Sequence, residues 1–514
     1  MNTRPLFTLV LLAALLASAC SAPYASAPQQ LQRQAAATSA PAMESVYCCS
    51  TGGTNTVNDE PYDATFFENY GTNPFIDTED DHLSTFAMDV DTASYTIIRR
   101  FLTDGNLPDK DAVRTEEVIN YFDWNYPEPE SGAFGIHIEG APSPFGGEKY
   151  WLVKVGLQGR HIEVENRKDA VLTFVIDVSG SMDMENRLGA VKQALRLLIE
   201  QLRPTDRVAL VVYGSTAHVV LDPTPATEPE TILAAIDRLQ PEGSTNAEAG
   251  LRLGYELAAR AYQEGAINRV MLCSDGVANV GNTGADSILR TIEDYAARGI
   301  TLSTVGFGMG NYNDVLMEQL ADKGDGNYAY VDTLDEARRI FVENLTGTLQ
   351  VIAKDAKIQV EFNPQVVSRY RLLGYENRDI ADDQFRDDTV DAGEVGAGHS
   401  VTALYEIKFH EGATGEALIT RIRYQDPDGA EVVEQSRRFS REEFAPTFDA
   451  ASPEFHLAAA VAEYAEILRQ SYWAKDGKMS DVLTLARRAL EELPNDKDVS
   501  EFVQLVERAT SLTP

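Results

Sequence analysis

The stretch TFVIDVSGSMD, residues 173–183, decides how the fold of this chain is interpreted. A run of residues typical of a buried strand ends in Asp177, Ser179 and Ser181, at every second position. Asp and Ser favour turns and helix N-caps, so one interpretation is a plain strand-to-helix junction. The other is a cation site, because carboxylate and hydroxyl oxygens are hard ligands that suit Mg²⁺. The rest of the sequence must decide between them.

Residues 168–350 alternate between continuous apolar runs and amphipathic stretches. The runs AVLTFVID, RVALVVYG, RVMLCSD and ITLSTVGFG are typical of parallel strands that are buried on both faces. The stretch after the first run has apolar residues at helical spacing, namely Leu188, Val191, Leu195, Leu198 and Leu202. This pattern predicts a doubly wound, Rossmann-like α/β domain, in which ligands bind outside the carboxyl ends of the strands.

Strand patterns flank this α/β domain on both sides. AFGIHIEGAP and KYWLVKVGLQG precede it, and five antiparallel strand candidates follow it as a predicted β-sandwich. The strands on the two sides can join in one sheet system, with the α/β domain inserted between them. Three helices are predicted at the C-terminal end. The predicted divisions are a lipoprotein signal peptide 1–19, a flexible tether 20–71, an N-terminal α+β region 72–167, the α/β domain 168–350, the β-sandwich region 351–445 and the C-terminal helices 446–514.

The N-terminus predicts export and a lipid anchor. An apolar run from Leu6 to Leu16 has the length of a secretory h-region, and LASAC resembles a bacterial lipobox ending at Cys20. An ordinary signal peptide with an incidental cysteine is the alternative, but the small residues adjoin Cys20 without a gap. We expect a protein held by lipid at Cys20, in the periplasm, at the outer membrane or at the cell surface. Cys48 and Cys49 could form a vicinal bridge, pair between chains or remain thiols.

The charge of the chain excludes several classes of partner. The 80 acidic residues exceed the 44 basic residues, which gives a formal net charge of −36. Phosphate groups of nucleic acids and of anionic membranes would be repelled, so neither is expected to bind the protein surface. We therefore expect membrane contact through the lipid anchor only. A solvated acidic surface accounts for most of the carboxylates.

Two other loops supply candidate ligands for a cation near Asp177. EGSTNAEAG places Thr245 just before a predicted helix, and MLCSDGVAN places Asp275 at the end of a second buried strand. Together with Asp177, Ser179 and Ser181, this set resembles the metal-ion-dependent adhesion site of von Willebrand factor type A (VWA) domains, and the resemblance covers residues 168–350.

The resemblance implies a role for each of these residues. The hydroxyls of Ser179, Ser181 and Thr245 would contact the metal, while Asp177 and Asp275 would mostly orient water around it. The implied cation is Mg²⁺, with Mn²⁺ or Ca²⁺ as alternatives. The implied function is binding of a partner protein whose carboxylate completes the coordination of the metal.

The flanks resemble a narrower group. STFAMDVDTASYTIIRRFL upstream and RYRLLGYENR downstream are similar to segments of bacterial lipoproteins that are built around a central VWA domain. Such proteins are often labelled calcium-activated chloride channel-like. A channel is not expected here, because nothing in the sequence can line a pore across a bilayer.

Enzymatic function is not expected, and neither is a small-molecule substrate. The sequence has no H-E-x-x-H zinc motif and no G-x-S-x-G elbow, and GFGMGN lacks a full phosphate-binding glycine pattern. The alternative function is an envelope scaffold or assembly factor whose metal site is only structural. Asp89, Asp91 and Ser94 echo the metal motif, but a strand followed by an N-cap is the preferred interpretation. The acidic stretch 379–394 is predicted to be a solvated hairpin loop.

Overall fold

The computed structural model describes residues 56–57, 60–61, 67–147, 149–276, 285–309, 312–429 and 431–513. The described residues all belong to one compact unit. Two short antiparallel strands, β1 (Thr56–Val57) and β2 (Glu60–Pro61), lie near its start. The predicted signal peptide, with Cys20, and most of the predicted tether lie outside the described residues.

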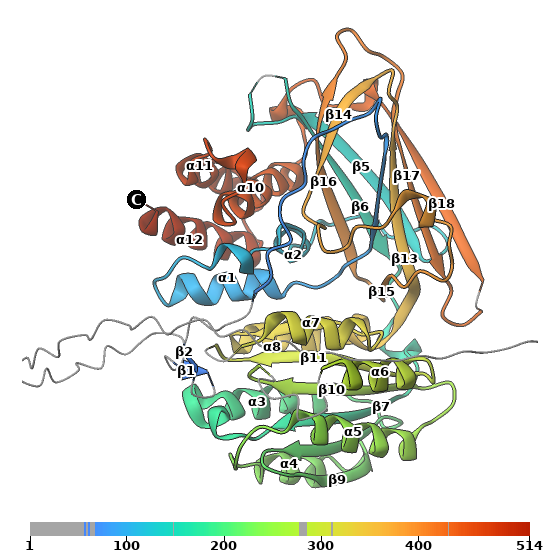
Figure 1. Cartoon of the computed structure of the whole chain (residues 1–514), viewed down its shortest axis with the longest axis vertical. Helices are drawn as coiled ribbons and strands as arrows, with labels where there is room; N and C mark the ends of the chain where they lie inside the picture. The colour runs from blue at the N-terminus through green and yellow to red at the C-terminus, as the bar shows by residue number, and fades with distance from the viewer. Residues whose placement is uncertain are drawn as a thin grey trace, which may run out of the picture. The chain divides into compact units, whose positions relative to one another are not determined.

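A six-stranded sheet forms the centre of the α/β domain (Figure 1). Its order is β12 (Tyr328–Val331), β11 (Ile300–Phe307), β10 (Ile267–Ser274), β7 (Ala170–Asp177), β8 (Arg207–Tyr213) and β9 (Ala217–Pro225). The first five strands are parallel, and β9 is antiparallel to β8. All eight residues of β7 are buried, as the continuous apolar runs predicted. Cys273 on β10 is a core residue, and burial raises the pKa of its thiol to about 12.

Helices cover both faces of this sheet, so the predicted doubly wound α/β fold is confirmed. One face packs against α3 (Arg187–Ile199), α4 (Pro229–Asp237), α8 (Leu334–Arg338) and α9 (Leu345–Leu349). The other face packs against α5 (Ala247–Ala261), α6 (Ala285–Ala296) and α7 (Asp314–Asp322). Alternate residues of each strand enter the two cores: Phe174 faces α3, and Val175 faces α5.

Two further sheets face each other as a sandwich (Figure 1). One contains β15 (Gly393–Gly396), β13 (Val351–Phe362), β17 (Glu416–Gln425) and β18 (Val432–Ser440), and β4 (Leu83–Ala87) also pairs with β13. The other has the order β3 (Ile76–Asp77), β14 (Val367–Leu373), β16 (Ser400–Phe409), β6 (Trp151–Gly159) and β5 (Phe134–Pro142). Buried side chains of both sheets, such as Val155 and Val360, share one core.

The α/β domain is inserted into this sandwich. β6 precedes the domain in the chain and pairs with β16, which follows it, with Val155 opposite Ala403. The two ends of the domain also meet, because the backbone N–H of Lys168 donates to Oε1 of Gln350 at 2.8 Å. The predicted joining of the strands before and after the domain is therefore confirmed.

Helices from both ends of the chain share a third core. α10 (Pro453–Leu468), α11 (Met479–Glu492) and α12 (Lys497–Leu512) pack with α1 (Ala93–Thr103) and α2 (Thr115–Asn120). α1 also reaches the α/β domain: Arg99 donates to Asp332 after β12, to Glu336 of α8 and to Glu501 of α12. Within the described ranges, no helix has both the length and the apolar character needed to span a bilayer.

Candidate functional site

Four of the five predicted site residues come to one edge of the central sheet, and the loop that contains the fifth, Thr245, runs beside them. Asp177 is the last residue of β7, and Asp275 directly follows β10, the parallel neighbour of β7. Ser179 and Ser181 lie in the turn between β7 and α3. The carboxyl ends of these parallel strands therefore bring the two aspartates and the two serines to the same place.

The loop that contains Thr245 runs beside the turn after β7. The N–H of Gly180 donates to the carbonyl of Gly243 at 3.1 Å, and the N–H of Glu242 donates to the carbonyl of Val178 at 2.5 Å. Thr245 is half-buried and lies two residues before α5. The third predicted loop is thus hydrogen-bonded to the first.

The two serine hydroxyls have a separation that suits a cation. Ser179 Oγ and Ser181 Oγ lie 3.0 Å apart, within hydrogen-bond distance of each other. Two adjacent ligands of an octahedral Mg²⁺, each about 2.0–2.1 Å from the ion, are also about 3 Å apart. Together with nearby carboxylates, this pair of hydroxyls forms the hard-oxygen donor set that Mg²⁺ prefers. The residues present fit the implied cation.

Asp177 is held rigidly at the end of β7. It is fully buried, its Oδ1 accepts from the N–H of Ser179 at 2.8 Å, and its Oδ2 accepts from the hydroxyl of Ser274 at 3.1 Å. Burial, followed by the nearby charge of Asp275, raises the pKa of Asp177 to about 7. Two carboxylates therefore lie close together in a region that water hardly reaches.

Asp275 has a cationic partner that the sequence did not indicate. Arg187, the first residue of α3, donates from Nη1 to Oδ2 of Asp275 at 2.7 Å and also donates to the carbonyl of Met309. Both side chains of the ion pair are almost fully buried. Sequence reasoning missed Arg187 because it lies in an amphipathic helix, where a basic residue normally points to solvent. Ser274 was missed as well, although it adjoins Asp275 in MLCSD.

A cavity of about 240 Å³ is lined by other residues. Residues from the middle of β11, such as Ser303, line it together with residues near the start of β16, such as His399 and Ser400. None of the five predicted site residues is among the described residues that line it. The cavity is therefore separate from the candidate metal site.

Three family models match successive parts of the chain. The model described as "von Willebrand factor" matches residues 61–154, and the von Willebrand factor type A domain model matches residues 172–344. The model for the C-terminal part of "Uncharacterized protein YfbK" matches residues 347–512. Domains of the VWA type mediate protein–protein interactions and are typically not enzymes.

Similar proteins occur in bacteria. "Uncharacterized protein YfbK" of Escherichia coli (strain K12) is 36% identical over 474 residues, which cover 87% of this chain and 81% of that protein. A "UPF0353 protein" of Mycolicibacterium vanbaalenii is 30% identical over 203 residues, 34% of this chain and 59% of that protein. A solved structure described as "von Willebrand factor type A from Catenulispora acidiphila" covers 75% of this chain and 91% of its own, with 16% identity and a TM-score of 0.44. The chain belongs to the family of bacterial VWA proteins that includes YfbK.

Proposed function

We propose that this protein binds a partner protein through a divalent cation at the edge of its VWA domain. The observation that carries the proposal is the pair of hydroxyls of Ser179 and Ser181, 3.0 Å apart beside the buried carboxylate of Asp177. The hydroxyls carry no charge, so a cation held by them keeps much of its attraction for an additional carboxylate. A partner protein that presents an Asp or Glu side chain supplies that carboxylate.

Each residue has a part in holding the cation, which we propose to be Mg²⁺, with Mn²⁺ or Ca²⁺ as alternatives. Ser179, Ser181 and Thr245 offer hydroxyl oxygens as direct ligands. Asp177 and Asp275 accept hydrogen bonds from water around the ion and supply the negative charge. Arg187 fixes the orientation of Asp275.

We place the protein in the cell envelope of a bacterium, held by lipid at Cys20. The apolar run and the small residues before Cys20 in the sequence support this localisation. An exported location is consistent with a cation-dependent site, because the site then meets the cations of the medium. A small-molecule substrate, a nucleic acid and an anionic membrane surface are not proposed as ligands.

A scaffold or assembly function is the alternative, with the metal site purely structural. The observation that favours it is the set of buried ion pairs that fix the VWA domain to the rest of the chain. Arg99 binds Asp332 and Glu336 in this way, and Arg114 of the segment before α2 binds Asp314 of α7. A scaffold needs such rigid attachment, whereas the exposure of the cation to a partner is irrelevant to it.

Affinity capture from solubilised envelope with the full chain separates the two functions. For a metal-dependent binding module, we expect partner capture in Mg²⁺, loss of capture with a chelator and loss in Asp177→Ala. Asp222→Ala is the matched control, because it removes the same charge from an exposed position on β9 of the same domain. Capture that survives both the chelator and Asp177→Ala would contradict the proposal and favour the scaffold.

A further inference from the structure

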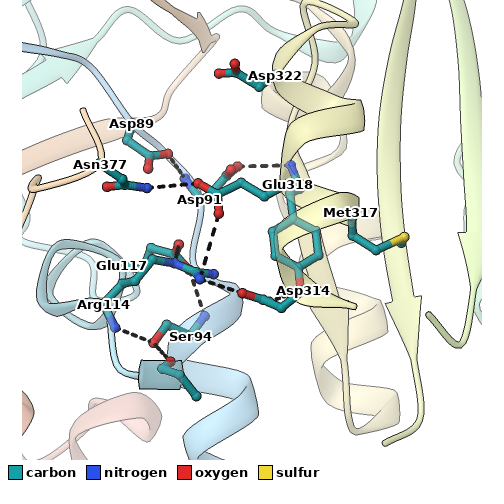
Figure 2. A network of polar contacts seen from close by, with 12 residues as sticks. Asp89, Asp91, Ser94, Arg114, Glu117, Asp314, Met317, Glu318, Asp322 and Asn377 are labelled. Carbon is teal, nitrogen blue, oxygen red and sulfur yellow. Dashed lines mark hydrogen bonds and ion pairs between the residues drawn. The ribbon is translucent and has the colours of Figure 1, made fainter. Parts of the chain in front are cut away.

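A second group of carboxylates meets where the VWA domain contacts the N-terminal region (Figure 2). Asp89 lies between β4 and α1, Glu117 lies in α2, and Glu318 lies in α7. One oxygen of each lies within 4.8 Å of the other two, and the residues are 5%, 0% and 5% exposed, respectively. We call these three residues the junction cluster. The sequence pattern around Asp89 predicted a strand followed by an N-cap and no metal, and the two other members of the cluster, Glu117 and Glu318, are distant from Asp89 in the sequence.

The junction cluster lies in a region with an excess of buried negative charge. Asp91 and Asp314 are two more buried carboxylates beside the cluster, which makes five in all. The guanidinium groups that pair with these carboxylates are those of Arg114 and Arg378. Buried charges without a counter-charge are costly, so either protons or a bound cation must neutralise the remaining negative charge.

The hydrogen bonds around the junction cluster leave one oxygen free. Arg378 donates to Asp89 Oδ2 at 3.0 Å and to Glu318 Oε1 at 3.0 Å, and Arg114 donates to Glu117 Oε1. Asn377 donates to the same Oε1 of Glu318 at 2.9 Å. Glu318 Oε2 is buried and has no hydrogen-bond partner within the described part of the chain, and Nη1 of Arg114 lies 3.8 Å from it. A buried carboxylate oxygen without a hydrogen-bond donor calls for an explanation, and an ion held by the cluster would supply one.

We propose that the junction cluster binds Ca²⁺. The ion would join three segments that are far apart in the sequence: the residues after β4, α2, and α7 of the VWA domain. Carboxylate oxygens within 4.8 Å of one another can bind one Ca²⁺ at about 2.3–2.6 Å each, whereas the shorter bonds of Mg²⁺ demand closer packing. Each oxygen that accepts a hydrogen bond retains a second lone pair for the metal. This site is independent of the one at Asp177.

Calcium binding to the full chain tests the proposal. We expect Ca²⁺ to raise the thermal midpoint of the wild-type protein and of Asp177→Ala, because the second site does not depend on the first. Glu318→Gln keeps the shape of the side chain but removes a charged ligand, so Ca²⁺ should bind about tenfold or more weakly at this site. Asp89→Asn should have the same effect. Calorimetry and thermal unfolding with CaCl₂ alone provide the two measurements.

Asp322→Asn is the matched control. Asp322 also binds Arg378, at 2.8 Å, but it is partly exposed and is not part of the junction cluster, so its loss should leave calcium affinity within about twofold. Two results would overturn the proposal. One is a calcium titration of Glu318→Gln that matches the wild type. The other is a loss of all calcium binding in Asp177→Ala, which would assign every bound ion to the VWA edge and leave protons to neutralise the junction cluster.

Discussion

Arg187 and Asp275 form a buried ion pair at the edge of the central sheet, with Nη1 2.7 Å from Oδ2. The pair connects the start of α3 to the loop after β10. Asp177 lies nearby, and no guanidinium donates to it in the contacts of the described residues. One arginine therefore faces two buried carboxylates. We expect a divalent cation to offset this excess of negative charge.

Arg187→Gln should make the thermal stability of the protein depend more strongly on Mg²⁺. Removal of one partner of a buried ion pair costs about 3–5 kcal/mol, so the metal-free variant should unfold at a lower temperature than the wild type. Mg²⁺ should then raise the midpoint by more than it does in the wild type, because the cation replaces the missing positive charge. Arg252→Gln, on the exposed face of α5, should have the thermal midpoint of the wild type both without metal and with Mg²⁺. An equal Mg²⁺ effect in Arg187→Gln and the wild type would contradict this interpretation.

Excision of residues 168–350 should leave a folded β-rich body. The two ends of the excised segment are already in contact, through Lys168 and Gln350, and β6 still has β16 as its neighbour. We expect a soluble protein with strand-type circular dichroism but a lowered thermal midpoint, because Arg99 loses Asp332 and Glu336. Arg99→Met in the excised protein should restore part of the lowered thermal midpoint. Aggregation of both excised forms would count against an independent sandwich.

Cys20→Ser should abolish lipid attachment. Metabolic labelling with a fatty-acid probe should mark the wild-type protein and spare the variant. Ser21 follows the cysteine at the position where Asp would signal retention in the inner membrane, so in a bacterium with two membranes we expect the outer membrane. Equal labelling of Cys20→Ser and the wild type would exclude Cys20 as the anchor.

Acid should destabilise the fold through His399. Burial, then Arg269 and His161, lowers the pKa of His399 to about 4 from its ordinary value of 6.5. The unfolded chain therefore binds a proton more readily than the folded chain, and stability should fall as the pH drops from about 6.5 toward 4, by up to about 1 kcal/mol per pH unit. Denaturant unfolding of His399→Gln should show a shallower slope in this range. His410→Gln, at an exposed histidine, should retain the wild-type slope.

The sequence predicted the strands of the α/β domain well because their signal is local. Continuous apolar runs identify β7, β8, β10 and β11 wherever their partners lie. The short strand β15 and the antiparallel edge strand β9 carry no such signal, since they are only partly buried. The spacing of the apolar residues Val113, Val118, Ile119 and Phe122 predicts a helix that is longer than the one observed. Val113 and Arg114 are extended, and α2 begins only at Thr115.

Contacts between residues that are distant in the sequence could not be predicted from the sequence. Asp177 and Asp275 could be brought together because both follow predicted parallel strands, so topology alone places them at one edge. No such rule pairs Arg187 with Asp275, or Asp89 with Glu117 and Glu318. Asp382 in the acidic stretch 379–394 likewise accepts from the hydroxyl of Thr85, whereas the sequence suggested a solvated loop. These contacts depend on how separate elements pack, which local pattern does not encode.

Calorimetric titration of Mg²⁺ tests the metal-dependent function most directly. The titration is made with the full chain in the wild-type background and repeated in the Glu318→Gln background, in which cation binding by the junction cluster is weakened. The site at the VWA edge should bind one Mg²⁺ in the wild type and in Asp222→Ala, bind it about 10–100-fold more weakly in Asp275→Asn, and lose it in Asp177→Ala. Magnesium affinity in Asp177→Ala equal to that of the wild type would contradict the proposed site.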